Sequence, residues 1–232
     1  MNWIVTHWNI VFYIILLLAL LLPRIPVIGK FFRGFNTLIH EAGHVLAAII
    51  TSGEVMEVNI FSDNSGNTLT KSKKKYAQIL IALSGYPISA LVGLFFIYLI
   101  HNKLYTPVVF IASSIVLLIW VISIRNTYGI IWSFCFLILN ILLLYIQHTL
   151  YIKIFAVFYA LILLCESVVS SFTLVALTNK NPKKAGDASN LAKLTKIPAI
   201  IWSLFFLLFS VICSLYAALN FFPRSFVLFT NG

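Results

Sequence analysis

The chain has 232 residues, of which 61% are hydrophobic and 9% are charged, and its mean hydropathy is +1.02. Soluble domains carry about 25% charged residues, so this composition excludes an ordinary soluble protein and indicates a polytopic membrane protein. The net charge of +10 comes without a soluble basic face interleaved with aromatic residues. We therefore expect contact with membrane lipids and no binding to nucleic acid.

Apolar runs long enough to cross about 30 Å of hydrocarbon can be placed seven times along the chain. The sequence thus predicts an all-α polytopic membrane protein with about seven transmembrane helices, folded as a single domain over residues 1–232. No separate soluble domain is expected. The expected spans are residues 4–22, 31–51, 77–100, 105–124, 128–147, 152–177 and 199–221.

A short β-hairpin is expected between the second and third spans, over about residues 54–70. Residues 54–61 alternate as E-V-M-E-V-N-I-F, and residues 62–66, S-D-N-S-G, supply turn chemistry before residues 67–70. A plain connecting loop is the alternative. In a peptidase, the edge of such a hairpin could pair with an extended substrate.

The second expected span carries the sequence HEAGH at residues 40–44. On a helix, His40 and His44 project from one face and can share one metal ion, with Glu41 beside them to transfer protons. This spacing is typical of zinc metallopeptidases, in which zinc needs a third protein ligand from elsewhere. Ionisable groups within a membrane span point to function, because each of them is costly there without a partner or a purpose.

The third ligand must come from a short list of acidic residues. The chain has six Asp and Glu residues: Glu41 lies in the motif, and three others belong to the expected hairpin. Glu166, inside an apolar span, and Asp187, after the sixth span, are the two that remain. Glu166 could serve the site or could instead pair with a polar or basic group inside the bundle.

The arrangement of these motifs resembles the site-2 protease family of intramembrane zinc metallopeptidases, and most closely its small bacterial peptidase-like branch. The features that carry the resemblance are the early HExxH helix, the hairpin after it, and a late N-x-x-P-x-x-x-x-D segment. In this chain the first motif is HEAGH, and the late segment is N-K-N-P-K-K-A-G-D at 179–187. The resemblance to the small bacterial branch comes from three further stretches: Gly186-Asp187-Ala188, L-A-K-L-T-K-I-P at 191–198 followed by Trp202, and R-N-T-Y-G at 125–129.

The resemblance implies a role for each matching residue. His40, His44 and Asp187 would bind Zn²⁺, and Glu41 would be the general base that activates water. Asn179 would help to hold the substrate backbone, and residues 179–197 would form the metal-ligand loop. The resemblance further implies proteolysis of transmembrane or membrane-proximal segments of other proteins, which would be its partners, in the inner membrane of a bacterium.

Two other functions are compatible with the motif. A divalent-metal transporter could carry histidine and glutamate within its helices, although it would need successive sites to pass an ion along. A non-catalytic relative could bind metal or partner helices without hydrolysis. The presence of Glu41, which structural zinc does not need, favours an enzyme.

The distribution of lysine and arginine predicts the orientation in the membrane. With seven spans, ten lysine and arginine residues fall on one side of the membrane and six, including Arg224, fall on the other. The side with more of these residues is expected to be cytoplasmic. This assignment puts the amino terminus, the hairpin and the active site on the cytoplasmic side. The ten residues are Lys71, Lys73, Lys74, Lys75, Arg125, Lys180, Lys183, Lys184, Lys193 and Lys196.

Overall fold

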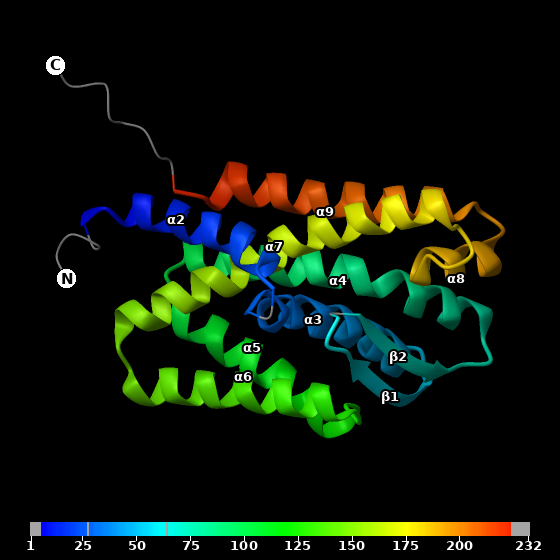
Figure 1. Cartoon of the computed structure of the whole chain (residues 1–232), viewed down its shortest axis with the longest axis horizontal. Coiled ribbons are helices and arrows are strands. Elements are labelled where there is room, and N and C mark those ends of the chain that lie inside the picture. The colour runs from blue at the N-terminus through cyan, green and yellow to red at the C-terminus, as the bar shows by residue number, and fades with distance from the viewer. Residues whose placement is uncertain (1–5, 27, 64, 224–232) are drawn as a thin grey trace, which may run out of the picture.

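The structure, a computed structural model, describes residues 6–26, 28–63 and 65–223, so Arg224 and the start of the first expected span lie outside it. It is a bundle of helices with one small sheet (Figure 1). In chain order the elements are α2 (Trp8–Leu21), η1 (Leu22–Arg24), α3 (Ile28–Ile50), β1 (Glu54–Ile60), β2 (Gly66–Lys71), α4 (Lys75–His101), α5 (Tyr105–Ile122), α6 (Thr127–Ile146), α7 (Thr149–Lys180), α8 (Gly186–Thr195) and α9 (Ala199–Phe221).

Five of the described helices are long and apolar enough to cross a membrane: α4, α5, α6, α7 and α9. Helices α2 and α3 can add one span together, as a pair bent by 101°. The 14 residues of α2 extend only about 21 Å, too short to cross alone. The all-α polytopic fold is confirmed, with five or six spans where the sequence predicts about seven.

The direction of the first helix differs from the prediction. Lys153 Nζ lies 3.4 Å from the centroid of the Trp8 ring and 5.4 Å from that of Tyr105. Trp8 therefore lies at the end of the bundle that holds the α4–α5 and α6–α7 loops. The hairpin and the lysine-rich loops lie at the opposite end (Figure 1). The prediction that the first helix starts on the hairpin side is wrong, because Trp8 and the hairpin lie at opposite ends of the bundle.

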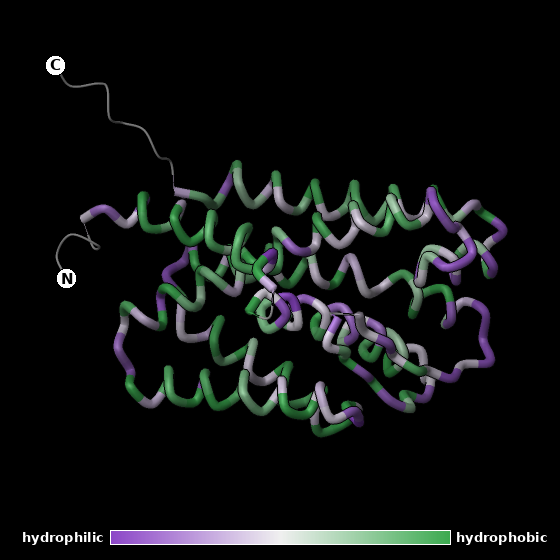
Figure 2. The backbone as a smooth tube through the Cα atoms, in the orientation of Figure 1, coloured by the Kyte–Doolittle hydropathy of each residue, from purple (hydrophilic) through white to green (hydrophobic). Residues whose placement is uncertain are grey.

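The polar residues of the bundle gather at its ends and around α3. Figure 2 shows α5 and α6 as almost continuously hydrophobic, whereas the loops at the hairpin end are hydrophilic. Exposed apolar side chains such as Phe110, Val121 and Ile141 project from these two helices. They form the surface expected to face lipid.

The predicted β-hairpin is confirmed and is extended by a third segment. Strands β1 and β2 pair antiparallel, from Glu54 opposite Lys71 to Ile60 opposite Gly66. On the other edge of β1, the α5–α6 loop pairs with the strand, and Val58 N donates to Ser123 O at 2.8 Å. Since β1 is covered on both sides, the open edge of the described sheet belongs to β2.

The R-N-T-Y-G junction fixes the hairpin to the bundle. Asn126 Oδ1 accepts a hydrogen bond from Ile60 N at 3.1 Å, and the Asn126 amide donates to Ile60 O. A Cβ atom at Gly129 would lie 2.7 Å from Asn126 Oδ1, so a glycine is needed there for close packing. The junction therefore holds the sheet in place beside α3.

Candidate metal centre and cleft

The two histidines of HEAGH lie on one face of α3, and their rings are fixed from outside the motif. His44 Nδ1 lies 2.7 Å from Ile81 O of α4. As the donor to this carbonyl, Nδ1 leaves Nε2 free to bind a metal. His40 Nε2 and His44 Nε2 are 3.1 Å apart.

Asp187 from the first turn of α8 completes a triangle with these nitrogens. Asp187 Oδ2 lies 3.2 Å from His40 Nε2 and 3.3 Å from His44 Nε2. In a tetrahedral site with zinc–ligand distances of about 2.0 Å, ligand atoms lie about 3.3 Å apart. The three donor atoms therefore fit the spacing of three corners of such a site, and the donor set of two imidazoles and one carboxylate suits zinc.

The approach of Asp187 to α3 depends on the turn that precedes α8. Ser189 Oγ accepts from Ala185 N at 2.7 Å and donates to Pro182 O at 2.8 Å, and Gly186 adopts φ +48°. At the other end of α8, Trp202 Nε1 donates to Thr195 Oγ1 at 3.1 Å. Much of the segment expected as a loop at 179–197 is thus a helix pinned at both ends.

The surroundings keep Asp187 ionised. Burial alone would raise the pKa of its carboxyl, but attraction to His44 and hydrogen bonds with His40 and His44 outweigh burial and lower that pKa below its usual value. The ionised carboxylate is the form that binds a metal ion.

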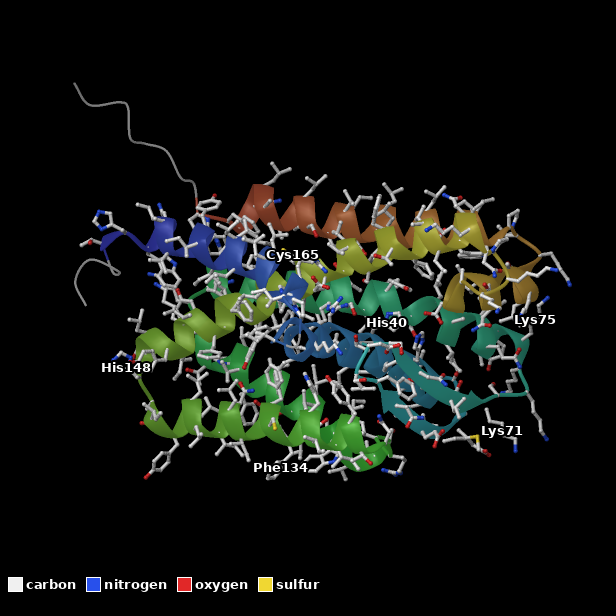
Figure 3. All side chains as sticks on the ribbon, viewed as in Figure 1. His40, Lys71, Lys75, Phe134, His148 and Cys165 are labelled. Carbon is white, nitrogen blue, oxygen red and sulfur yellow. The ribbon has the colours of Figure 1, made fainter. Side chains whose placement is uncertain are left out.

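His40 occupies a space that only glycine leaves open on α4. A Cβ atom at Gly85 would lie 2.5 Å from His40 Cε1. The Tyr86 ring packs edge-on against the imidazole, with centroids 4.5 Å apart, and stacks on Phe206 of α9. In Figure 3, His40 lies in the interior of the bundle, while Lys71 and Lys75 mark the hairpin end.

Glu41 points toward the hairpin. It is buried, with 4% of its surface exposed, and Thr68 Oγ1 of β2 donates to its Oε2 at 2.6 Å. A Cβ atom at Gly66 would collide with the same carboxylate. The sheet therefore supplies both the space that Glu41 occupies and the hydrogen bond that orients it.

These groups share a cleft of about 660 Å³. Its lining comes from α3, from β2 between Gly66 and Thr70, from α4, and from the part of α8 that carries Asp187 and Asn190. Ser170 of α7 also lines it. A cleft of this size, lined in part by a strand with an open edge, has room for an extended peptide.

The structure does not bring every predicted site residue to the cleft. His40, Glu41, His44 and Asp187 line it, whereas Asn179 is exposed near the end of α7 and is not among its lining residues. The cleft contains other polar residues that motif reasoning missed, among them Asn36, Thr68 and Tyr86. Of these, only Asn36 has a sequence signal, since it lies four residues before His40 and so shares its helix face.

Glu166 pairs with a basic group and does not join the histidines. Its Oε1 accepts a hydrogen bond from Arg24 Nη2 at the break between α2 and α3, and its side chain is 5% exposed. Arg125 donates instead to the backbone oxygens of Ile122 and Ile124. The pair links the amino-terminal helices to α7, since a buried carboxylate needs such a partner.

Replacement of Glu166 by Gln should leave the metal content unchanged. The variant should instead unfold more readily, by about 1 to 3 kcal/mol, because Arg24 loses its charged partner. Zinc analysis and thermal unfolding of the purified variant measure both effects. Loss of zinc with normal stability would show that Glu166 serves the metal.

Comparison with known proteins identifies the family. No curated protein and no solved structure matches the chain. The family model described as Peptidase M50B-like matches residues 11–217, most of the chain. This match agrees with the helical membrane fold and with the His40, His44 and Asp187 group. The chain belongs to the Peptidase M50B-like family, whose wider M50 family consists of zinc-dependent peptidases.

Proposed function

We propose that this protein is an intramembrane zinc metalloendopeptidase that cleaves transmembrane or membrane-proximal segments of other proteins. The observation that carries the proposal is the convergence of His40, His44 and Asp187 on one point, with Glu41 beside them, in a cleft that β2 also lines. A purely structural metal site would require neither the buried glutamate beside the ligands nor the cleft next to them.

The roles of the residues follow from their positions. Zinc bound by His40, His44 and Asp187 would supply Lewis acidity, which lowers the pKa of water and polarises a peptide carbonyl. Glu41 takes the proton of the attacking water and delivers it to the leaving amine. Because Thr68 binds Glu41 Oε2, the other carboxylate oxygen remains available for this transfer. Tyr86, which stacks on Phe206, packs against the His40 ring and holds it in position.

The open edge of β2 would receive the substrate as an added strand. A transmembrane helix hides its carbonyls in its own hydrogen bonds, so the segment must unwind before it can be cleaved. Backbone groups on an open strand edge can replace the hydrogen bonds that the unwound segment loses. The walls formed by β2 and α8 hold that strand over the metal ligands.

The described residues give less support to the two other candidate functions. A transporter needs successive ion sites, yet one group of three metal-binding side chains is found among the described residues. A non-catalytic relative has no need of a buried glutamate oriented toward the cleft by Thr68.

The cleft would open toward the cytoplasm. The lysine-rich loops and the hairpin lie at one end of the bundle (Figures 1 and 3). Positively charged loops are retained on the cytoplasmic side of a membrane. In a bacterium, the protein would therefore lie in the inner membrane, with its site reached by water from the cytoplasm.

The proposal is tested by reconstituting the zinc-loaded protein in liposomes with a set of single-span membrane proteins. Mass spectrometry should find a new amino terminus within or next to a transmembrane segment, and a zinc chelator should prevent its formation. A zinc-loaded protein that cleaves none of the set, under conditions where a soluble zinc peptidase cleaves its own substrate, would contradict the proposal.

The bond from Thr68 to Glu41 predicts a moderate kinetic effect. Thr68→Val keeps the shape of the side chain but removes the hydroxyl, so Glu41 loses its orientation and kcat should fall about 10-fold. Thr70→Val is the matched control, because Thr70 lines the same cleft. Equal rates in the two variants would show that the hydroxyl of Thr68 does not support the reaction.

A further inference from the structure

Asn36 is a buried amide at the cleft with an unused acceptor. It lies one helical turn before His40 on α3, is 7% exposed and lines the cleft. Its side-chain oxygen is buried and has no hydrogen-bond partner. Its backbone oxygen accepts from Ser89 Oγ at 3.5 Å, so this contact with α4 is made by the main chain and does not use the side-chain oxygen.

The chain treats a second buried asparagine quite differently. Asn140 is 0% exposed. Its amide nitrogen donates to Phe136 O at 2.8 Å, and its oxygen accepts from Tyr159 at 3.1 Å. Such complete pairing is the rule for buried polar groups, since an unpaired one is costly. An unpaired buried oxygen on a residue that lines a cleft therefore points to a ligand that supplies the missing donor.

The chemistry of an amide matches the main chain of a peptide. The oxygen of Asn36 can accept from a backbone N–H, and the amide nitrogen can donate to a backbone carbonyl. Four residues along α3 separate Asn36 from His40, a rise of about 6 Å. An extended peptide covers about 3.3 Å per residue. Asn36 is thus about two residues away from a peptide bond held at the metal ligands.

We infer that Asn36 binds the backbone of the cleaved segment about two residues from the scissile bond. This role is the one that motif matching assigns to Asn179, which lies outside the cleft. The inference rests on the proposed function and extends it: β2 holds the substrate strand along one edge, and Asn36 fixes its register over His40 and Glu41. Because the contact is to the main chain, it does not depend on the substrate sequence.

The test measures binding without hydrolysis. The zinc-loaded Glu41→Gln protein is titrated with a fluorescent apolar peptide of about 20 residues, prepared with one backbone N–H replaced by an ester oxygen at each position in turn. The series is repeated with Asn36→Ala added, and with Asn190→Ala added as a control, since Asn190 lines the same cleft but is exposed. Zinc content and thermal unfolding establish that each variant is folded.

One ester position should weaken binding about 10-fold when Asn36 is present and leave it unchanged in Asn36→Ala. Esters that disturb pairing with β2 should weaken binding equally in both proteins, and Asn190→Ala should retain the position-specific loss. If every ester has the same effect with and without Asn36, or if no peptide binds, the inference is overturned. The proposed function fails separately, if the protein with Glu41 intact cleaves none of these peptides.

Discussion

Replacement of Glu41 by Gln should abolish proteolysis and leave zinc in place. Glutamine has nearly the same shape, and its amide oxygen can still accept the hydrogen bond from Thr68, but it cannot take a proton from water. Loss of a general base lowers rates by about 10²- to 10⁴-fold, so kcat should fall to the detection limit. Cleavage of a membrane reporter and zinc analysis are measured on the same preparation.

The matched control for Glu41→Gln is Glu57→Gln, because Glu57 is a hairpin glutamate that does not line the cleft. This control should retain both activity and zinc. Full proteolytic activity in Glu41→Gln would contradict the peptidase assignment. Loss of zinc together with activity would instead show that Glu41 maintains the metal site.

Replacement of His44 by Ala should remove both zinc and activity. In the proposed site His44 would supply one of three donor atoms, and its ring is held by Ile81 O. With two donors left, the affinity for zinc should fall by at least about 10²-fold. Loss of a residue that only hydrogen-bonds to a metal ligand already lowers metal affinity by about 10- to 100-fold. Zinc titration of the purified protein measures the change.

The contrast between the two variants separates the roles of the motif residues. Glu41→Gln should give an inactive protein with zinc, and His44→Ala an inactive protein without it. His101→Ala serves as the control for histidine loss, because His101 lies at the far end of α4. Zinc retained at full affinity in His44→Ala would place the metal elsewhere.

Local sequence patterns predict the parts of this fold that depend on neighbouring residues. HEAGH predicts that two histidines project from one face of a helix, because i and i+4 positions share a helix face, and the structure places them so. The alternation before the S-D-N-S-G turn specifies the hairpin for a similar reason. The family resemblance, confirmed by the match over residues 11–217, adds Asp187 as a predicted ligand, and its carboxylate lies beside His40 and His44.

The parts that were missed depend on tertiary packing. Hydropathy counts apolar residues but cannot show that the chain bends by 101° between Arg24 and Ile28, so that α2 and α3 are not two separate spans. The polar side chains of α3 that line the cleft, among them His40, Glu41 and His44, pack against α4, the sheet and α8. Likewise, no local pattern predicts that Thr68 reaches Glu41 or that Gly85 makes room for His40.

The position of α8 explains why Asn179 and Asp187 separate in space. The sequence presents them as one motif, but α7 continues through Lys180 and the chain then turns before α8 begins at Gly186. Asp187 is carried back over the histidines by this turn, whereas Asn179 remains exposed on α7. A shared motif in sequence therefore does not place both residues at one site.

The zinc content of the detergent-purified protein, compared with that of Asp187→Asn, tests the central claim most directly. The claim is that one metal ion is held by two helices far apart in the chain, α3 and α8. It predicts about one zinc per wild-type chain and little or none in Asp187→Asn, with thermal unfolding showing that the variant is folded. Wild-type protein without zinc after reconstitution, or Asp187→Asn with its full complement, would contradict it.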